Sequence, residues 1–68
     1  MNSPLLKKFG KRVRQLRDER GISQERLGEL AKVHRTYVGM IERGEKNITL
    51  TNIEKFAKAL NVKLTDLL

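Results

Sequence analysis

The chain has 68 residues, and its fifteen Lys or Arg against eight Asp or Glu give a formal net charge of +7. A chain of this length supports one small core, and the absence of cysteine and the single histidine exclude a disulfide framework and a zinc site. No apolar run approaches the roughly 20 residues that a membrane-spanning helix needs, and the N-terminus has no long apolar leader segment. We therefore expect one cytoplasmic domain over residues 1–68, with a positive charge that favours a polyanionic partner.

The first predicted helix begins near Pro4, which suits a first helical turn, with Ser3 or Asn2 as its cap. Apolar residues then recur at steps of four, four and three, namely Leu5, Phe9, Val13 and Leu16. We expect this face to be buried and the helix to end by Gly21. Gly10 inside the helix indicates either a close approach by another element or loosely held first turns.

Two short helices that meet at a sharp turn are predicted between Gln24 and Arg43. The apolar residues of this stretch are Leu27, Ala31, Val33, Val38 and Ile41. The first two are four residues apart, as one helical face requires, whereas Val33 is out of step and the last two restart a three-residue spacing. Ser23 is a good N-cap for the first helix, and Gly44 suits the left-handed end of the second. The pattern is typical of a helix-turn-helix unit, at about 24–43.

The second helix of this unit carries a polar outer face, whose members are Arg35, Thr36, Gly39 and Arg43. An exposed face of this kind can read DNA. Gly28, in the first helix, has no side chain at the place where a second helix is expected to cross closely. These features make the unit the part of the chain on which a function is expected to depend.

A fourth helix is predicted after Thr49, its N-cap, and is expected to end at Asn61, which tolerates a left-handed conformation. Its buried face is expected to consist of Leu50, Ile53, Phe56, Ala57 and Leu60. One further helical turn follows and contains three leucines, Leu64, Leu67 and Leu68. Because these leucines exceed what one short turn can bury alone, we expect them to form the interface of a homodimer. The alternative is that they close the core of the monomer, which applies best to Leu64.

The segments GISQERLGELA and HRTYVGMIERGEKNITLTNIEKFAKAL, followed by LTDLL, resemble the lambda repressor-like, Cro/C1-type (XRE) helix-turn-helix family over roughly Phe9 to Leu68. In size the chain is similar to restriction-modification controller proteins and small phage regulators. The resemblance implies an all-α, compact five-helix domain that binds double-stranded DNA with its third helix in the major groove. It also implies a sequence-specific transcription regulator that acts as a homodimer on a palindromic operator.

The resemblance places Arg35 and Thr36 at the start of the recognition helix, where they contact base edges. Arg43, near the same face, either meets a guanine or a phosphate or satisfies the helix dipole. His34 stands where a serine or threonine cap is common, and it either caps the helix weakly or contacts phosphate or base. Gly39 and Met40 occupy positions that are polar readers in many relatives. We therefore expect sparse direct readout, with DNA shape supplying much of the discrimination.

Phosphate contacts are implied for seven residues, which are Gln24, Tyr37, Arg17, Lys46, Asn47, Thr49 and Asn52. For Gln24 the physics agrees, since the positive N-terminus of a helix favours anions. Thr49 is better explained as a cap than as a phosphate ligand, and Tyr37 is equally explained as a half-buried ring. Arg17 also resembles one half of an ion pair with Glu42 that ties the recognition unit to the first helix. Lys32 departs from the family pattern, because it holds a turn position that is usually glycine.

Other functional classes are weighed against this interpretation. One alternative is an antitoxin-like or partner-binding helical module, in which the basic segment Lys7–Arg20 docks an acidic protein and DNA binding is secondary. Membrane association by the same segment is disfavoured, since no wide apolar face is free of the core. Glu25, Glu29 and Glu45 are candidates for contact with RNA polymerase and are equally explained as solvated charges. No catalytic arrangement is present, so we expect no enzyme, cofactor, metal or small-molecule substrate.

Overall fold

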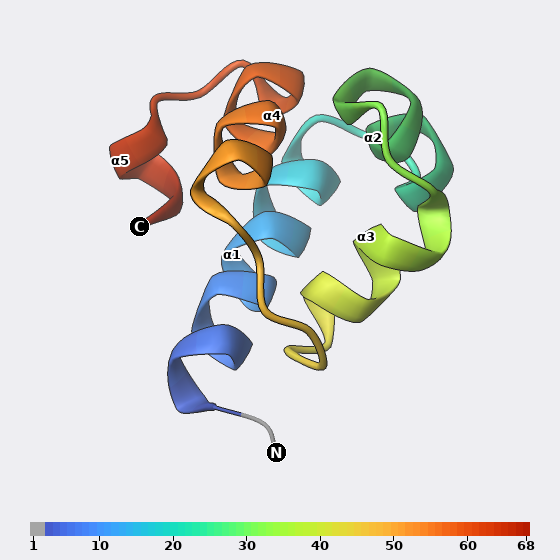
Figure 1. The fold of residues 1–68 in the computed structure, drawn as a ribbon. Helices are drawn as coiled ribbons and strands as arrows, with labels where there is room; N and C mark the ends of the chain where they lie inside the picture. The colour runs from blue at the N-terminus through green and yellow to red at the C-terminus, as the bar shows by residue number, and fades with distance from the viewer. Residues whose placement is uncertain (1–2) are drawn as a thin grey trace.

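Five α-helices build the fold in the computed structural model, which describes residues 3–68 (Figure 1). They are α1 (Pro4–Glu19), α2 (Gln24–Ala31), α3 (Arg35–Glu42), α4 (Leu50–Leu60) and α5 (Leu64–Leu67). The later turns of α1 pass behind α4, and α1 contacts α3, α4 and α5, whereas α2 packs against α3 and α4. Residues 3–68 contain no strand, and the predicted all-α, five-helix architecture is confirmed.

Three helices begin at a hydroxyl side chain that accepts a hydrogen bond from a backbone N–H, as the sequence predicts. The pairs are Ser3 with Leu5, Ser23 with Arg26 and Thr49 with Asn52, at 3.1, 3.0 and 3.1 Å. Asn2, the alternative cap of α1, lies outside the described residues. At α5 the N-cap residue is the donor instead, because the backbone N–H of Lys63 donates a 3.0 Å hydrogen bond to the Asp66 carboxylate inside the helix. Local side chains therefore determine where these helices start.

Left-handed residues follow four of the helices, namely Gly21, Lys32, Gly44 and Asn61. Lys32, with φ of 61°, confirms that a lysine takes the turn position usually held by glycine, at a cost of roughly 1–2 kcal/mol. Gly44, with φ of 71°, ends α3 with two backbone bonds, from Gly44 N–H to Ile41 O at 3.1 Å and from Glu45 N–H to Met40 O at 2.9 Å. The left-handed conformation of Lys32 therefore ends α2 and makes the sharp turn into α3.

The buried core draws on all five helices. Its apolar members are Phe9, Val13, Leu16, Leu27, Ala31, Val38, Ile41, Ile53, Phe56, Ala57, Leu60 and Leu67. Two residues that the helical periodicity predicted to be buried are not: Leu5 is 73% exposed and Leu50 is 75% exposed. Each lies in the first turn of its helix, and Figure 1 shows the first turns of α1 projecting beyond the other helices. No helix within residues 3–68 has the length and apolar character to cross a membrane.

The three C-terminal leucines divide in a way that the sequence did not predict. Leu67 is only 3% exposed and packs into the core, whereas Leu64 is 40% and Leu68 is 72% exposed. Leu67 is therefore not free to form an interface, and the alternative that a leucine closes the monomer core holds for Leu67 rather than for Leu64. Of the three leucines, only Leu67 belongs to the buried core cluster.

Gly10 marks a close approach of α1 to α3, rather than loosely held turns. A Cβ at this position would lie 2.4 Å from the Ile41 carbonyl oxygen and 2.5 Å from that of Glu42. Gly28 is also tightly covered, but its nearest neighbour is the Val33 carbonyl oxygen in the turn, at 2.7 Å from an added Cβ. The nearest neighbour of Gly28 is therefore in the turn, and the next is the start of α3, whose Arg35 backbone N lies 3.3 Å from the added Cβ. Both glycines let backbone approach backbone around α3.

Candidate nucleic-acid interface

A polar network holds α3 against the rest of the fold. The buried Glu42 carboxylate accepts hydrogen bonds from Arg17 Nε at 2.7 Å and Nη2 at 3.1 Å, so the predicted ion pair forms. Gln24, the first residue of α2, donates from Nε2 to the same carboxylate at 3.0 Å. The hydrogen bonds to Glu42 raise the pKa of the Arg17 guanidinium above its ordinary value, against the opposing effect of burial. Three helices are thereby joined at one carboxylate.

The start of α3 presents two exposed side chains, Arg35 and Thr36. The cap is His34, whose Nδ1 accepts a 3.0 Å bond from the Thr36 backbone N–H, so the ring caps this helix. Arg35 lies 3.7 Å from a Glu25 carboxylate oxygen, with both side chains about two thirds exposed, at 65% and 66%. A pair this exposed contributes at most about 1 kcal/mol, so Arg35 can leave it for a DNA base without a large loss.

The end of α3 is organised around a glycine. Gly39 was predicted to lie on the exposed polar face, but it is buried. A Cβ added to Gly39 would lie 3.1 Å from Arg43 Nη1 and 3.5 Å from Gln24 Oε1, so both side chains cover it. Arg43 Nε in turn donates to Glu45 Oε2 at 2.8 Å. This hydrogen bond raises the pKa of Arg43 and lowers that of Glu45.

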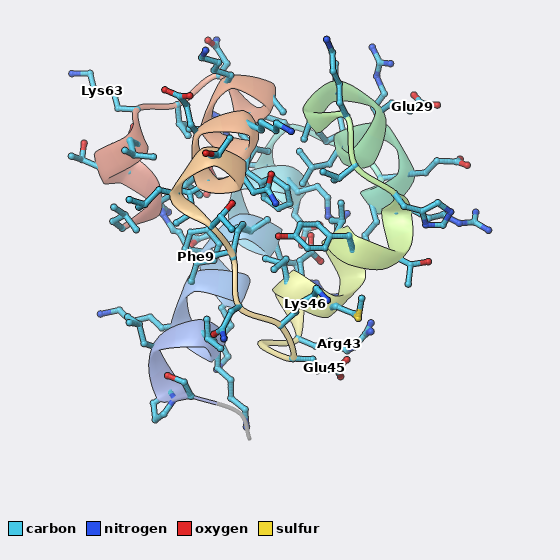
Figure 2. All side chains as sticks on the ribbon, in the orientation of Figure 1. Phe9, Glu29, Arg43, Glu45, Lys46 and Lys63 are labelled. Carbon is cyan, nitrogen blue, oxygen red and sulfur yellow. The ribbon has the colours of Figure 1, made fainter. Side chains whose placement is uncertain are left out.

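The segment between α3 and α4 carries the predicted backbone-contacting residues. Figure 2 shows Arg43, Glu45 and Lys46 gathered at this end of α3. Lys46 and Asn47 are exposed, while the hydroxyl of Thr49 is already used as the α4 cap. A DNA phosphate can meet the first two directly, whereas Thr49 is explained by its cap.

Tyr37 links the recognition helix to α4. Its hydroxyl accepts a 3.0 Å bond from Asn52 Nδ2, and its ring meets Phe56 edge-on, with centroids 6.3 Å apart. The half-buried ring is therefore part of the packing, while its polar end and the Asn52 amide remain together near the surface. This arrangement fits the packing role, and it also leaves a hydroxyl near the start of α4.

Arg12 of α1 and Arg20, the residue directly after α1, have structural roles that the sequence did not indicate. Arg12 Nε donates to the Asp66 carbonyl oxygen at 2.8 Å, and Arg20 Nε donates to the Leu60 carbonyl oxygen. They fasten α1 to α5 and to the end of α4. No local pattern could have revealed these bonds, because each joins residues more than 39 positions apart along the chain. Fewer basic residues of α1 are thus free to dock an acidic partner than the composition suggests.

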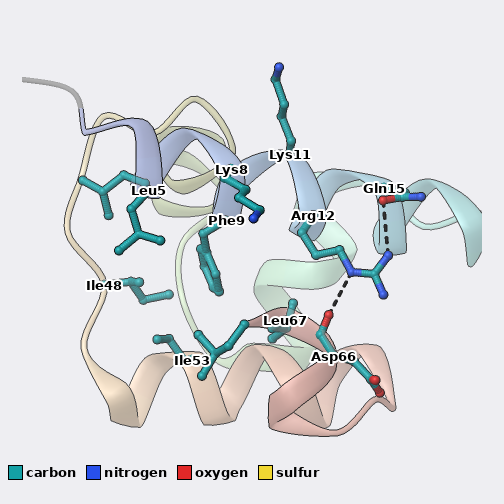
Figure 3. Close-up of a pocket in the computed structure, with 12 residues that line it drawn as sticks. Leu5, Lys8, Phe9, Lys11, Arg12, Gln15, Ile48, Ile53, Asp66 and Leu67 are labelled. Atoms are coloured by element: carbon teal, nitrogen blue, oxygen red, sulfur yellow. Dashed lines mark hydrogen bonds between the residues drawn. The ribbon is translucent and has the colours of Figure 1, made fainter.

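An open apolar groove of about 540 Å³ lies between α1, the segment before α4, α4 itself and α5 (Figure 3). Its apolar lining consists of Leu5, Leu6, Phe9, Ile48, Ile53, Leu67 and Leu68. Exposure of Leu5 is explained here, since it borders the groove instead of entering the core. Within residues 3–68 there is no cluster of three or more acidic or histidine side chains that could hold a metal ion.

Comparison with known proteins gives one family and several relatives. The family model described as Helix-turn-helix matches residues 13–67. Control protein C.BamHI of Bacillus amyloliquefaciens is 51% identical over 61 residues, which cover 88% of this chain and 75% of the relative. Control protein C.SmaI of Serratia marcescens is 46% identical over 56 residues, covering 82% and 67%. The solved structure of the restriction-modification controller protein C.AhdI from Aeromonas hydrophila superposes with a TM-score of 0.95 and 45% identity, over 97% of this chain and all of that one.

Proposed function

Since the chain belongs to the helix-turn-helix family of DNA-binding transcription regulators, we propose that it binds a two-fold operator as a homodimer and regulates transcription there. The observation that carries this proposal is the exposed pair Arg35 and Thr36 at the start of a helix that a buried ion pair locks to the scaffold. A reading helix must be held rigidly, because small misplacements lose base contacts. We propose that the protein acts in the cytoplasm.

In this proposal Arg35 reads guanine through O6 and N7, and Thr36 offers a hydroxyl or a methyl to the adjacent base pair. Arg43 adds a contact at the far end of α3. His34 serves mainly as the cap, and its ring edge lies close to the same bases. These side chains supply the sequence-dependent part of the binding energy, about 1–3 kcal/mol for each good bidentate contact.

Phosphate contacts set the register of α3 in the groove without reading bases. We assign them to Lys46 and Asn47 beyond α3, to the amide of Gln24 at the α2 N-terminus, and to the polar ends of Tyr37 and Asn52. Thr49 is left to its cap, and Arg17 contributes chiefly by holding Glu42. The net charge of +7 favours association with DNA in general, with a strong dependence on salt.

The dimer is proposed to form through the apolar groove and the leucines beside it. Leu5 of α1, Leu64 of α5 and the terminal Leu68 are exposed, and a second copy of the chain would cover them. One recognition helix offers too few base contacts for a tight specific site, whereas two would span half-sites about 34 Å apart. The groove lies away from Arg35 and Thr36, so a partner seated in it leaves α3 free for DNA.

The relatives suggest a narrower role. Two are named as control proteins, and the solved structure with the TM-score of 0.95 is a restriction-modification controller. We propose that this chain likewise controls the genes of a restriction-modification system. Exposed Glu25 and Glu29 on α2 are the proposed contact with RNA polymerase in that role.

The test is selection of bound DNA from a random pool, followed by measurement of how affinity for the winner depends on salt. A recovered palindrome supports specificity and symmetry together. Arg35→Ala should abolish enrichment, while Arg14→Ala, an exposed arginine of α1, removes the same charge and should leave the palindrome unchanged. Enrichment of no sequence at all would overturn the proposal and favour the partner-binding module.

The dimer has its own test in solution. Leu68→Lys should shift the chain from dimer to monomer in sedimentation, whereas Leu30→Lys, at an exposed leucine of α2 that is 42% accessible, should not. A wild-type chain that stays monomeric at micromolar concentration, in the presence and absence of operator DNA, would refute the dimer.

A further inference from the structure

Arg43 lies across a helix surface that has no side chain of its own. The Gly39 position leaves room for the guanidinium, since an added Cβ would be 3.1 Å from Arg43 Nη1 and 3.8 Å from Cζ. Gln24 Oε1 lies beside the same point, at 3.5 Å from that Cβ. The terminal atoms of Arg43 and Gln24 therefore share the outer surface of α3 at Gly39.

A carboxylate two residues further on determines which edge of the Arg43 guanidinium is in use. Glu45 Oε2 accepts a hydrogen bond from Nε at 2.8 Å, which leaves the edge formed by Nη1 and Nη2 for another acceptor. Glu45 is itself placed by the end of α3, because its backbone N–H bonds to the Met40 carbonyl oxygen at 2.9 Å. The backbone of Glu45 is thus anchored at a defined position beside the recognition helix, from which its carboxylate reaches Arg43.

Building on the proposed DNA-binding function, we propose that Glu45 is a positioning residue for DNA recognition, which holds the Arg43 guanidinium over Gly39 with its Nη edge available to a guanine or a phosphate. A free arginine side chain samples many rotamers and must lose this freedom when it binds. Glu45 and Gly39 restrict Arg43 beforehand, one by holding Nε and the other by leaving the space that the guanidinium occupies.

Charge alone predicts a different effect of Glu45. A carboxylate near DNA repels phosphates, so removing it should strengthen binding to every DNA sequence alike. A positioning carboxylate should instead improve binding to the operator relative to other DNA. The quantity that separates the two roles is the specificity ratio, which is the Kd for unrelated DNA divided by the Kd for the operator.

The substitution Gly39→Ala separates an effect on the position of Arg43 from an effect on the stability of the fold. In Gly39→Ala the new methyl group meets only the flexible ends of Arg43 and Gln24, so the backbone need not move. Alanine is a better helix former than glycine, so the thermal midpoint should stay the same or rise. Arg43 is nevertheless displaced from its place, and the specificity ratio should fall.

The experiment measures the specificity ratio of the full chain on the operator recovered from the random pool, for wild type, Glu45→Gln, Gly39→Ala and the control Glu54→Gln. Glu54→Gln removes the same charge from an exposed site on α4. We expect Glu45→Gln to lower the ratio about 3-fold for each half-site, the size of a modest exposed ion pair, while affinity for unrelated DNA rises. In an Arg43→Ala background the same change should leave the ratio unaltered.

The outcomes are separable. If Glu45→Gln and Glu54→Gln strengthen operator and unrelated DNA equally, Glu45 acts only through its charge and the inference is overturned. If Glu45→Gln lowers the ratio equally in the Arg43→Ala background, Glu45 does not act through Arg43 and the inference is likewise wrong. If the wild-type chain recovers no operator, the proposed function fails and this inference fails with it.

Discussion

Replacing Glu42 with alanine would remove the acceptor on which three helices converge. The variant loses the hydrogen bonds from Arg17 Nε at 2.7 Å and Nη2 at 3.1 Å and from Gln24 Nε2 at 3.0 Å. The side chain of Arg17 is only 12% exposed, so its charge would remain largely desolvated without its main partner. Breaking a buried pair in this way typically costs about 3–5 kcal/mol.

The lower end of that range applies here, for two reasons. The Arg17 guanidinium keeps a 3.0 Å bond from Nη1 to the Ile22 carbonyl oxygen, and Asp18 lies 3.5 Å away. We therefore expect a loss of about 3 kcal/mol in the free energy of unfolding. For a domain of this size 1 kcal/mol shifts the melting temperature by about 4–8 °C, so the midpoint should fall by at least about 12 °C.

Thermal unfolding followed by circular dichroism measures this shift. The matched control is Glu29→Ala, which removes a carboxylate paired with Arg26 at 3.1 Å, where both side chains are more than half exposed. That change should move the midpoint by at most about 8 °C, because exposed pairs contribute at most about 1 kcal/mol. If Glu42→Ala proves too unstable to purify, Glu42→Gln keeps one acceptor and should give an intermediate loss. Equal midpoints for the Glu42 and Glu29 variants would refute the reasoning.

Three further predictions concern other parts of the molecule. In urea unfolding, Gly10→Ala should lower the free energy of unfolding more than Gly21→Ala. The new Cβ at Gly10 would lie 2.4 Å from a backbone oxygen, whereas the Cβ at Gly21 would have open space and would only strain a backbone with φ of +64°. The reverse order would contradict the close helix crossing at Gly10. The pKa of Glu45, measured by NMR, should lie below the ordinary glutamate range, because Arg43 stabilises the charged carboxylate. Since the folded-state pKa is lowered, this stabilisation is present above the unfolded-state pKa and is lost as the pH falls through the folded-state pKa. Arg43→Ala should return the pKa of Glu45 toward its ordinary value. Tyr37→Phe should cost about 1 kcal/mol in unfolding free energy, since it removes one hydroxyl hydrogen bond, and no measurable loss would indicate that this bond is not maintained in solution.

Residues close together in the chain account for what could be predicted from the sequence. Ser23 and Thr49 cap their helices through N–H groups three residues away, and Lys32 and Asn61 take the left-handed conformation as expected. Such features depend on groups within one helical turn, so sequence order is enough to identify them. The ion pair between Arg17 and Glu42 was predicted only through the resemblance, since the two residues are 25 positions apart.

Exposure could not be read from the same pattern. Leu5 and Leu50 continue the apolar periodicity of their helices yet lie at ends that no other helix covers. Gly39, predicted on the reading face, is covered by side chains from two different helix ends. Periodicity shows which face of a helix is apolar, but it does not show how far along the helix its partners reach.

The five helices, the caps Ser23 and Thr49, the sharp turn at Lys32 and the family could be inferred from the sequence alone, because each depends on local chemistry or on a continuous motif. The packing of the helices was needed to establish that Leu67 fills the core while Leu68 stays exposed, and that Arg12 and Arg20 hydrogen-bond to α5 and to the end of α4. Those outcomes depend on which segments lie side by side in space. Burial and hydrogen bonding between distant residues exist only once the helices have packed.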